Sequence, residues 1–514
     1  MSRRPRGRSS RRSLSAGLLS LAAAVGAAWS CSDRGPREPP NILLVVLDTV
    51  RRDHVSCYGY PLPTTPHLDA LAAVADRYEG CWSTAPWTLP SHASLFTGQY
   101  AFQHGARSGR TASGHIVDAL PLASERLTLA EALDEQGYET AAFVANTAYL
   151  RPDLGLHQGF DTYVVDRRKG VAMNELALGW LDERAERLAS APAEEERPFF
   201  LFVNYMDAHR PYNTTEFEGE RAGALPAPSP ERSQELLDQL YEEVFSQEDP
   251  PPAELVAKVV AQYDMGIANA DVALGRLIAE LRARGLYDAT LIVVTSDHGE
   301  YLGEHDLVEH SKDVYEEALR VPLVVKRAGQ ERGRVIEDRV SLAHMPSLVL
   351  AELPREMSRR LAGAFPAPPG EDAWIAENEY SRSKDLGAPY GNRFARERVV
   401  LYQDEFKLIL SSDGENELYD LEADPREQVN LFATKPELAE RLERRLHKIL
   451  DETPRHTGPQ TAPEMTPEQE EELRKLGYTD VETPSGPQEV PVPPSAPVES
   501  GSAADPADPA TEDR

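Results

Sequence analysis

Three short apolar runs in this sequence each end abruptly at acidic or histidine residues. They are Asn41–Leu47, which precedes Asp48, Pro198–Met206, which precedes Asp207 and His209, and Leu291–Thr295, which precedes Asp297 and His298. A continuous apolar run of this length is typical of a parallel strand buried on both faces. In open α/β sheets, ligands bind beyond the carboxyl ends of such strands. One aspartate after a strand is often only a turn or cap residue, but three such endings favour one site at one sheet edge.

The remaining pattern predicts helices and strands that alternate through residue 395. Helices are predicted over 64–76, 126–136, 263–284 and 340–352, and further strands over 138–144, 321–325 and 373–376. Residues 213–256 are polar and irregular, with clusters of proline and glutamate, so we expect an insertion near the mouth of the site. The length of 514 residues suits one large α/β domain and a smaller one.

The pattern changes near residue 397. Short strands are predicted at 398–402, 406–410 and 417–420, separated by turn residues, which indicates a small antiparallel sheet. Helices are expected at 436–451 and 466–476, and the Pro-, Ser- and acid-rich composition after residue 482 favours a disordered tail. The predicted divisions are an export signal (1–30), a linker (31–39), a large domain (40–395), a C-terminal subdomain (396–480) and the tail (481–514).

The segment Pro86–Gly98, PWTLPSHASLFTG, predicts a helix with a hydroxyl at its start. Pro90 suits the first helical turn, where its missing N–H costs nothing, and Gly98 suits the position just past the helix end. Thr88 would lie just ahead of the N-terminus, where free N–H groups and the helix dipole favour an anion. Thr88 is therefore either a plain N-cap residue or a hydroxyl placed against a bound anionic ester.

The formal charge of −31 narrows the possible partners. Such an acidic chain is a poor match for nucleic acid, and it would repel large polyanions unless basic groups line the site. His310 and Lys312 follow the strand that ends at Asp297, and they are either anion-binding residues or solvated loop residues. Arg51, just after Asp48, is another candidate substrate contact.

The N-terminus has the composition of a targeting segment. Six arginines lie between Arg3 and Arg12, the apolar run Leu14–Ala28 follows, and SRRSLSAGLL resembles a twin-arginine export signal. Cys31 directly follows Ala28-Trp29-Ser30, as in a bacterial lipoprotein cleavage site, although Trp29 replaces a small residue. We expect an exported protein, either lipid-anchored at Cys31 in the bacterial envelope or free in the periplasm. No later apolar run is long enough to span a bilayer.

Cys57 and Cys81 are the remaining cysteines. In an oxidising compartment they would be able to form a disulfide, and the alternative is two separate buried thiols. Their spacing in the sequence does not decide between the two, because disulfide formation depends on geometry.

Taken together, these motifs resemble the sulfatase family of the alkaline phosphatase superfamily. The resemblance runs from about Pro40 to Tyr478, through NILLVVLDTVRRDHVSCYGY, TTPHLDALA, PWTLPSHASLFTG, FFLFVNYMDAHRPY, TLIVVTSDHGE, VYEEALRVPLVV and LYDLEADPREQVNL. It implies an alkaline-phosphatase-like α/β fold, with a mixed, mostly parallel central sheet flanked by helices and a small C-terminal antiparallel-sheet subdomain. It also implies a metal-dependent hydrolase of sulfate or phosphate esters.

The resemblance implies roles for individual residues. The metal ligands would be Asp48, Asp297, His298 and Thr88, the nucleophile Thr88, the leaving-group or substrate contacts His209 and His310, and the further substrate contacts His92, Lys312 and Arg51. One divalent ion is expected: oxygen ligands favour Ca²⁺ or Mg²⁺, while His298 allows Mn²⁺ or Zn²⁺. The expected substrate is a sulfated or phosphorylated small molecule, glycan or lipid.

Two positions depart from the sulfatase pattern. Sulfatases carry Cys or Ser, oxidised to formylglycine, followed by x-Pro-Ser-Arg, whereas this chain reads Thr88-Leu89-Pro90-Ser91-His92. Thr49 stands where many sulfatases have another acidic metal ligand. The set is more similar to superfamily members that use threonine directly, such as phosphoethanolamine and phosphoglycerol transferases, while phosphonate monoester hydrolases share the Asp and Asp-His frame.

These residues are consistent with three functions. The first is an ester hydrolase with Thr88 as the direct nucleophile. The second is a transferase that moves a phospho-group to a surface glycan or lipid, although the usual transferases have several membrane helices and none is predicted here. The third is a catalytically inactive anion-binding protein, which the presence of all three other metal-ligand positions disfavours.

Overall fold

The computed structural model describes residues 38–110, 116–190, 192, 196–212, 233–246, 250–365, 372–379, 393–458, 461–463 and 465–476. The chain divides into two units, residues 1–38 and 39–514, and the second contains every element described below. The predicted export signal, Cys31 and the acidic tail lie outside the described residues, so those interpretations stay predictions.

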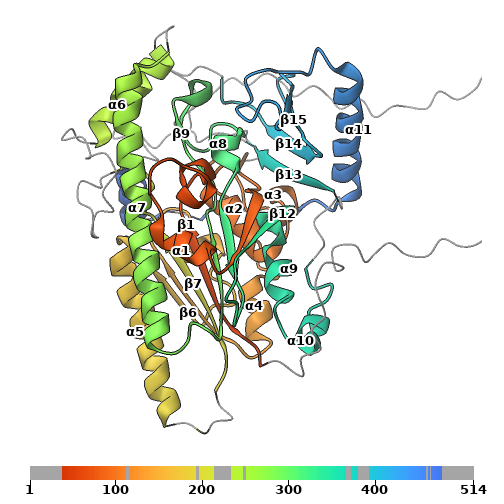
Figure 1. The fold of residues 1–514 in the computed structure, drawn as a ribbon. Coiled ribbons are helices and arrows are strands. Elements are labelled where there is room, and N and C mark those ends of the chain that lie inside the picture. Colours follow the sequence, from red (N-terminus) through yellow and green to blue (C-terminus); the bar gives the residue numbers. More distant parts are fainter. Residues whose placement is uncertain are drawn as a thin grey trace, which may run out of the picture. The chain divides into compact units, whose positions relative to one another are not determined.

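An eight-stranded mixed sheet forms the centre of the second unit (Figure 1). Its strands, in spatial order, are β12 (Arg334–Ser341), β2 (Asp76–Trp82), β11 (Leu323–Lys326), β8 (Thr290–Thr295), β1 (Asn41–Leu47), β7 (Phe199–Tyr205), β5 (Glu139–Val144) and β6 (Thr162–Val165). Strand β11 runs antiparallel to both of its neighbours, and the other pairings are parallel. The predicted α/β fold with a mostly parallel central sheet is confirmed.

The three apolar runs of the sequence occupy the middle of this sheet. Strand β1 lies between β8 and β7, and its residue Val46 pairs with Thr295 on one side and Asn204 on the other. Strands with neighbours on both edges and helices on both faces must be apolar throughout, which explains the unbroken runs. Because all three strands are parallel and in register, their carboxyl ends meet at one edge, as the sequence predicted.

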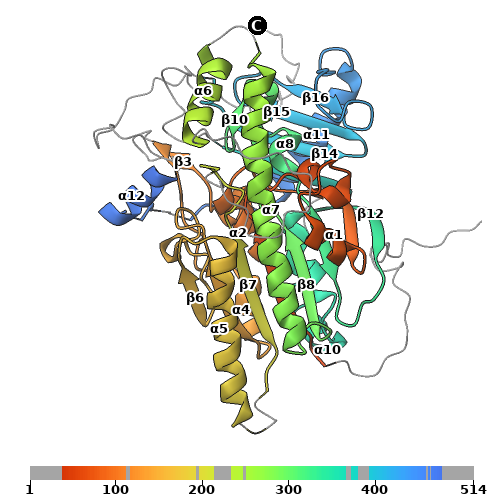
Figure 2. The ribbon, with the colours of Figure 1, turned by 60° about the vertical axis from the view of Figure 1, so that its left-hand side comes forward.

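Helices cover both faces of the sheet. On one face, Leu43 and Val45 of β1 pack in a core with α5 (Gly170–Ala189) and α7 (Ala253–Ala283), which Figure 2 shows in front of the strands. On the other face, Leu44 and Val46 share a core with helices of three further segments. These are α2 (Thr88–Thr97), α4 (Leu129–Asp134) and α9 (Met345–Leu350). The alternation of adjacent β1 residues between two cores follows from the two-residue period of a strand.

A separate antiparallel sheet lies in the C-terminal part. It consists of β13 (Ala373–Asn378), β14 (Arg398–Gln403), β15 (Phe406–Ser411) and β16 (Glu417–Asp420). Helix α11 (Pro436–Glu452) packs on it through Leu442 and Leu446, and α12 (Pro467–Lys475) follows. The predicted small antiparallel sheet is confirmed, and it also contains β13.

The described residues contain further α-helices and β-strands. They are α1 (Pro66–Ala72), α3 (Ala101–His104), β3 (Gly109–Arg110), β4 (Ile116–Val117), α6 (Ser233–Ser246), β9 (Tyr301–Leu302), β10 (Val308–Glu309), α8 (Glu316–Leu319) and α10 (Arg355–Arg360). Cys57 and Cys81 are separate free thiols. None of the described helices is both long and apolar enough to cross a bilayer.

Several sequence-based boundaries were wrong. Strands β2 and β12 were not predicted, because charged residues interrupt their apolar positions, and β12 is exposed along most of its length. Within the predicted irregular insertion, α6 is a helix and α7 already begins at Ala253 instead of Tyr263. The helix predicted over 340–352 starts later, because Ser341 still belongs to β12.

Candidate active site

Three predicted metal ligands meet at the carboxyl ends of β1 and β8. Asp48 directly follows β1, and Asp297 and His298 follow β8. One ligand atom from each of the three side chains lies within 4.8 Å of the others, and all three side chains are fully buried. The structure therefore brings this trio together as the sequence predicted.

Each carboxylate of this trio has one hydrogen-bonded oxygen and one open oxygen. Asp48 Oδ2 accepts hydrogen bonds from the side-chain amides of Asn146 (3.0 Å) and Asn204 (3.2 Å). Asp297 Oδ1 accepts from the backbone N–H groups of Thr49 (3.1 Å) and His298 (2.9 Å). Asp48 Oδ1 and Asp297 Oδ2 are buried and have no hydrogen-bond partner within the described part of the chain. Since buried polar atoms normally have partners, these two oxygens fit a cation.

His298 completes this arrangement with a nitrogen. Its Nδ1 lies 2.9 Å from the carbonyl of Gly299, which only accepts hydrogen bonds, so Nδ1 carries the proton. Nε2 therefore presents a lone pair, 3.4 Å from Asp297 Oδ2. A second ring nitrogen held by a carbonyl is the usual arrangement of a metal-binding histidine.

The electrostatics of the trio also fit a cation. Burial, reinforced by repulsion from Asp297, raises the pKa of Asp48 to about 7. Burial likewise raises the pKa of Asp297 to about 7, although backbone N–H groups and the Thr88 hydroxyl act in the opposite direction. Two buried carboxylates cannot both be ionised cheaply unless a positive charge lies between them.

Thr88 is the first residue of α2 and faces the trio. Its Oγ1 lies 3.4 Å from His298 Nε2 and 3.3 Å from Asn146 Nδ2. Ser91, one turn along the helix, donates to the backbone carbonyl of Asp297 (2.6 Å) and so fixes the helix to the end of β8. The predicted helix is confirmed, but it starts at Thr88 with Trp87 as the N-cap residue, so Thr88 is not the N-cap; Gly98 ends the helix in the left-handed conformation as predicted.

Two further predicted histidines lie beside the trio. The ring of His310 is 4.6 Å from the ring of His298 and 5.1 Å from that of His209. His310 Nδ1 lies 2.9 Å from Glu300 Oε1, and His209 Nδ1 lies 2.6 Å from the carbonyl of Arg210. Each imidazole is thus oriented through its Nδ1 contact.

The predicted anion contact Lys312 lies among buried charged and polar side chains. Its ammonium lies 3.3 Å from Glu309 Oε2 and donates a hydrogen bond to the hydroxyl of Tyr241 (3.1 Å), which α6 supplies. Arg210 forms an ion pair with the same Glu309. The sequence did not single out Arg210, Glu309 or Tyr241.

His92 and Arg51 lie in less direct positions. His92 is buried on α2, with Nδ1 3.0 Å from the backbone carbonyl of Thr88 and 3.6 Å from Asp297 Oδ2. It therefore lies behind the nucleophile position. The guanidinium of Arg51 is paired with Asp53 (2.8 Å) and Glu304 (2.7 Å). These contacts favour supporting roles for both residues.

Sequence reasoning missed Asn146 and Asn204, which hold Asp48. Asn146 lies just past β5 and Asn204 lies within β7, the strand that pairs with both β1 and β5. The rule that ligands lie at carboxyl strand ends would have pointed to Asn146, because the strand over 138–144 was predicted. A neutral amide carries no metal or acid–base signature, so its residue type gives no signal of a functional role.

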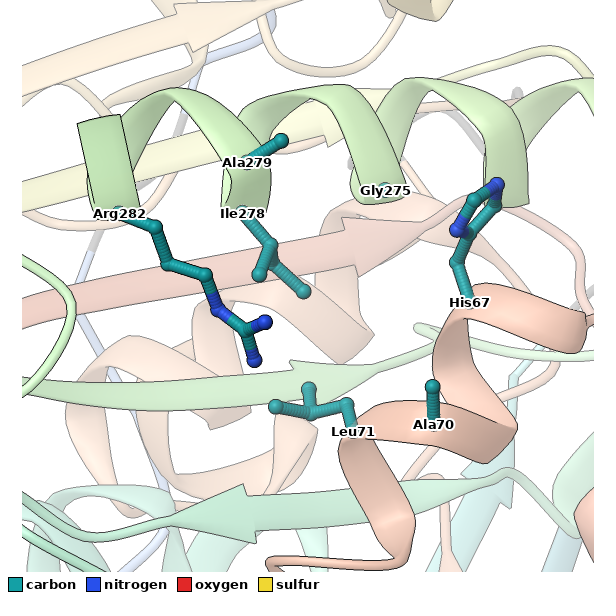
Figure 3. Close-up of a pocket in the computed structure, with 7 residues that line it drawn as sticks. All are labelled: His67, Ala70, Leu71, Gly275, Ile278, Ala279 and Arg282. Atoms are coloured by element: carbon teal, nitrogen blue, oxygen red, sulfur yellow. The ribbon is translucent and has the colours of Figure 1, made fainter.

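A separate cavity of about 250 Å³ lies between α1 and α7 (Figure 3). It is lined by His67, Ala70, Leu71, Gly275, Ile278, Ala279 and Arg282. None of these residues belongs to the cluster around Asp48, and the lining includes no carboxylate.

Comparison with known proteins agrees with this geometry. The family model described as Sulfatase matches residues 40–351. The chain belongs to the sulfatase family. This protein is therefore a hydrolase of sulfate or phosphate esters, and it is a member of the alkaline phosphatase superfamily.

Relatives of this sulfatase-family protein differ in their named activities. The N-acetylglucosamine-6-O-sulfatase of Bacteroides thetaiotaomicron is 24% identical over 85% of this chain and 90% of its own. The multifunctional alkaline phosphatase superfamily protein PehA of Trinickia caryophylli is 28% identical over 76% of this chain and 91% of its own. The solved structure of the phosphonate monoester hydrolase SpPMH from Silicibacter pomeroyi has the same fold. Its TM-score is 0.56 at 22% identity, and the match covers 81% of this chain and 96% of that one.

Proposed function

We propose that this protein hydrolyses sulfate or phosphate esters with Thr88 as the direct nucleophile. The observation that carries the proposal is the position of Thr88 Oγ1, 3.4 Å from His298 Nε2 at the N-terminus of α2. By the resemblance of the motif Thr88-Leu89-Pro90-Ser91-His92, Thr88 stands where sulfatases have the formylglycine precursor. A hydroxyl at this place, beside two carboxylates with open oxygens, suits direct attack on an anionic ester.

Asp48, Asp297 and His298, together with Thr88, would hold one divalent cation. The buried open oxygens of the two carboxylates and the lone pair on His298 Nε2 support this assignment. A bound ion would supply positive charge that polarises the ester and lowers the pKa of the Thr88 hydroxyl. The oxygen ligands favour Ca²⁺ or Mg²⁺, while the His298 nitrogen allows Mn²⁺ or Zn²⁺.

The proposed reaction has two displacements. The Thr88 hydroxyl gives its proton to solvent water, and its oxygen forms a bond to phosphorus or sulfur as the bond to the ester oxygen breaks. His310 gives a proton to the departing oxygen through Nε2, a contribution typically worth ~10²–10⁴-fold in rate. Burial lowers the pKa of His209 to about 3, so neutral His209 would contact the substrate without donating from Nε2. Water then attacks the Thr88 ester, the bond to Thr88 breaks, and the hydroxyl is restored.

The proposed substrates are sulfated or phosphorylated small molecules or glycans. The named activities of the relatives support this class, since one acts on a sulfated sugar and another is called multifunctional. Lys312 and Arg210 bring positive charge close to His310, and their shared partner Glu309 limits the net charge. Such a site suits a small anion better than a polyanion.

Turnover of p-nitrophenyl sulfate and bis-p-nitrophenyl phosphate, scanned across the four metals, tests this proposal. Thr88→Ala should abolish turnover of whichever ester is cleaved, and Thr88→Ser should retain part of it because the hydroxyl is kept. The matched control is Thr97→Ala, a buried threonine at the other end of α2 whose hydroxyl bonds to the carbonyl of Ala93. Full turnover by Thr88→Ala would refute the proposal.

A further inference from the structure

The side-chain amide of Asn146 lies between the proposed nucleophile and a proposed metal ligand. Its Oδ1 accepts hydrogen bonds from the backbone N–H groups of Ala148 (3.1 Å) and Tyr149 (2.9 Å). Because those two groups only donate, the amide can adopt one orientation. The NH₂ group therefore faces Asp48 Oδ2 at 3.0 Å and Thr88 Oγ1 at 3.3 Å, which accounts for its two hydrogens.

The segment around Asn146 is held firmly against the start of α2. The backbone N–H of Asn146 donates to Asn204 Oδ1 (3.1 Å). The ring of Tyr149 meets the ring of Trp87 edge to face at 5.3 Å, and Trp87 immediately precedes Thr88. Asn146 itself is fully buried. A donor fixed in this way need not reorganise when charge develops on its acceptor.

We infer that Asn146 is a further catalytic residue, which donates a hydrogen bond to the Thr88 oxygen while that oxygen carries negative charge. The inference rests on the proposed role of Thr88 as nucleophile. Charge develops on this oxygen twice, first as it attacks and again as water displaces it from phosphorus or sulfur. In the second step Thr88 is the leaving group, and an alkoxide leaves slowly unless its negative charge is stabilised. The Asn146 donor therefore contributes most to breakdown of the covalent Thr88 ester.

Asn204 provides a matched control for this inference. Its amide donates to the same Asp48 Oδ2 at 3.2 Å, and none of its hydrogen bonds in the described part of the chain reaches Thr88. Loss of either amide removes one hydrogen bond from Asp48. Loss of Asn204 also removes the acceptor of the Asn146 backbone N–H, and only loss of Asn146 removes the donor to Thr88. A comparison of the two variants thus separates support of Asp48 from action on the nucleophile.

The experiment uses the full chain with Mn²⁺ and bis-p-nitrophenyl phosphate. Pre-steady-state release of p-nitrophenol, the mass of the acid-quenched Thr88 peptide, and Mn²⁺ affinity are measured for wild type, Asn146→Ala and Asn204→Ala. Asn146→Ala should slow steady-state turnover about 100-fold, the typical effect of removing one such donor. It should also show a burst and a Thr88 adduct. Asn204→Ala should weaken Mn²⁺ binding without accumulating the adduct.

Three outcomes would overturn the inference. The first is equal loss of turnover in both variants with no adduct, and the second is a loss in Asn146→Ala that saturating Mn²⁺ restores. If Asn146→Ala does not fold, Asn146→Asp keeps the acceptor for Ala148 and Tyr149 and removes the donor. The third outcome that would overturn the inference is breakdown of the Thr88 ester at the wild-type rate in Asn146→Asp. Turnover by Thr88→Ala would instead refute the proposed function itself, so the two failures are distinguishable.

Discussion

Gly299 lies where the strand end carrying Asp297 and His298 packs against another backbone segment. A Cβ atom built at this position would lie 1.9 Å from the carbonyl oxygen of Glu317 and 2.9 Å from Arg51 Cγ. Two backbone hydrogen bonds join the same segments, from Gly299 N to Ala318 O (2.8 Å) and from Glu300 N to Glu317 O (3.2 Å). Since even crowded Cβ contacts stay near 3 Å, Gly299→Ala would have to push the segments apart by about 1 Å.

The expected cost of Gly299→Ala follows from this displacement. Overpacking of a filled site typically costs ~1–3 kcal/mol, and each weakened hydrogen bond adds about 1 kcal/mol. We expect the free energy of unfolding to fall by about 3 kcal/mol. We also expect weaker Mn²⁺ binding, because the carbonyl of Gly299 holds His298 Nδ1 and would move with the backbone.

Urea unfolding and Mn²⁺ titration of Gly299→Ala test this prediction against a matched glycine. Gly179 lies within α5, and a Cβ added there meets nothing within 4 Å. Gly179→Ala should therefore be stabilising by ~0.5–1 kcal/mol, the usual gain for alanine in a helix interior. The packing argument is wrong if the free energy of unfolding of Gly299→Ala lies within about 0.5 kcal/mol of the wild-type value, the range usual for surface substitutions.

Two further predictions concern charged groups outside the ligand trio. Burial raises the pKa of Asp76, but hydrogen bonds and charge from Arg334 and Arg327 outweigh it and lower the pKa below its ordinary value. The ion pairs therefore stabilise the fold above the unfolded-state pKa of 3.8, and this stability is lost as the pH falls further. Asp76→Asn should cost about 3 kcal/mol at pH 7 and progressively less below pH 4, and urea unfolding that shows a pH-independent difference would contradict this account. Tyr241→Phe removes the hydroxyl that accepts from Lys312, so we expect a severalfold rise in KM with unchanged thermal stability. An unchanged KM would show that Tyr241 does not position Lys312 for the substrate.

The sequence predicted the centre of the fold because strands buried on both faces must be apolar throughout. Strands β1, β7 and β8 were recognised for that reason, and the residues that follow them gave Asp48, Asp297 and His298. Strand β2 was missed because DRYEGCW combines charged and apolar residues, and its charged Asp76 is neutralised by arginines on other segments. Such pairing between distant segments leaves no periodic signal in the sequence.

The candidate site was predictable where residue type alone implies chemistry. His209 follows a predicted strand end, and the family resemblance implied roles for His209 and His310 together with the trio. The amides of Asn146 and Asn204 act through orientation, which depends on backbone N–H groups that only the fold positions. Arg51 illustrates the converse, because its charge suggested substrate binding whereas the fold places Asp53 and Glu304 around it.

The in-register meeting of β8 with β1 has a consequence for biosynthesis. Asp48 and Asp297 are separated by most of the folded chain, and strand pairings of such long sequence separation form slowly. A nascent or truncated chain that ends before β8 holds the threonine and one carboxylate but lacks the other ligands. If the proposed site is correct, we expect no ester cleavage before β8 has docked beside β1. Metal capture would then report that β8 has docked beside β1, and it would stabilise only chains that have passed that step.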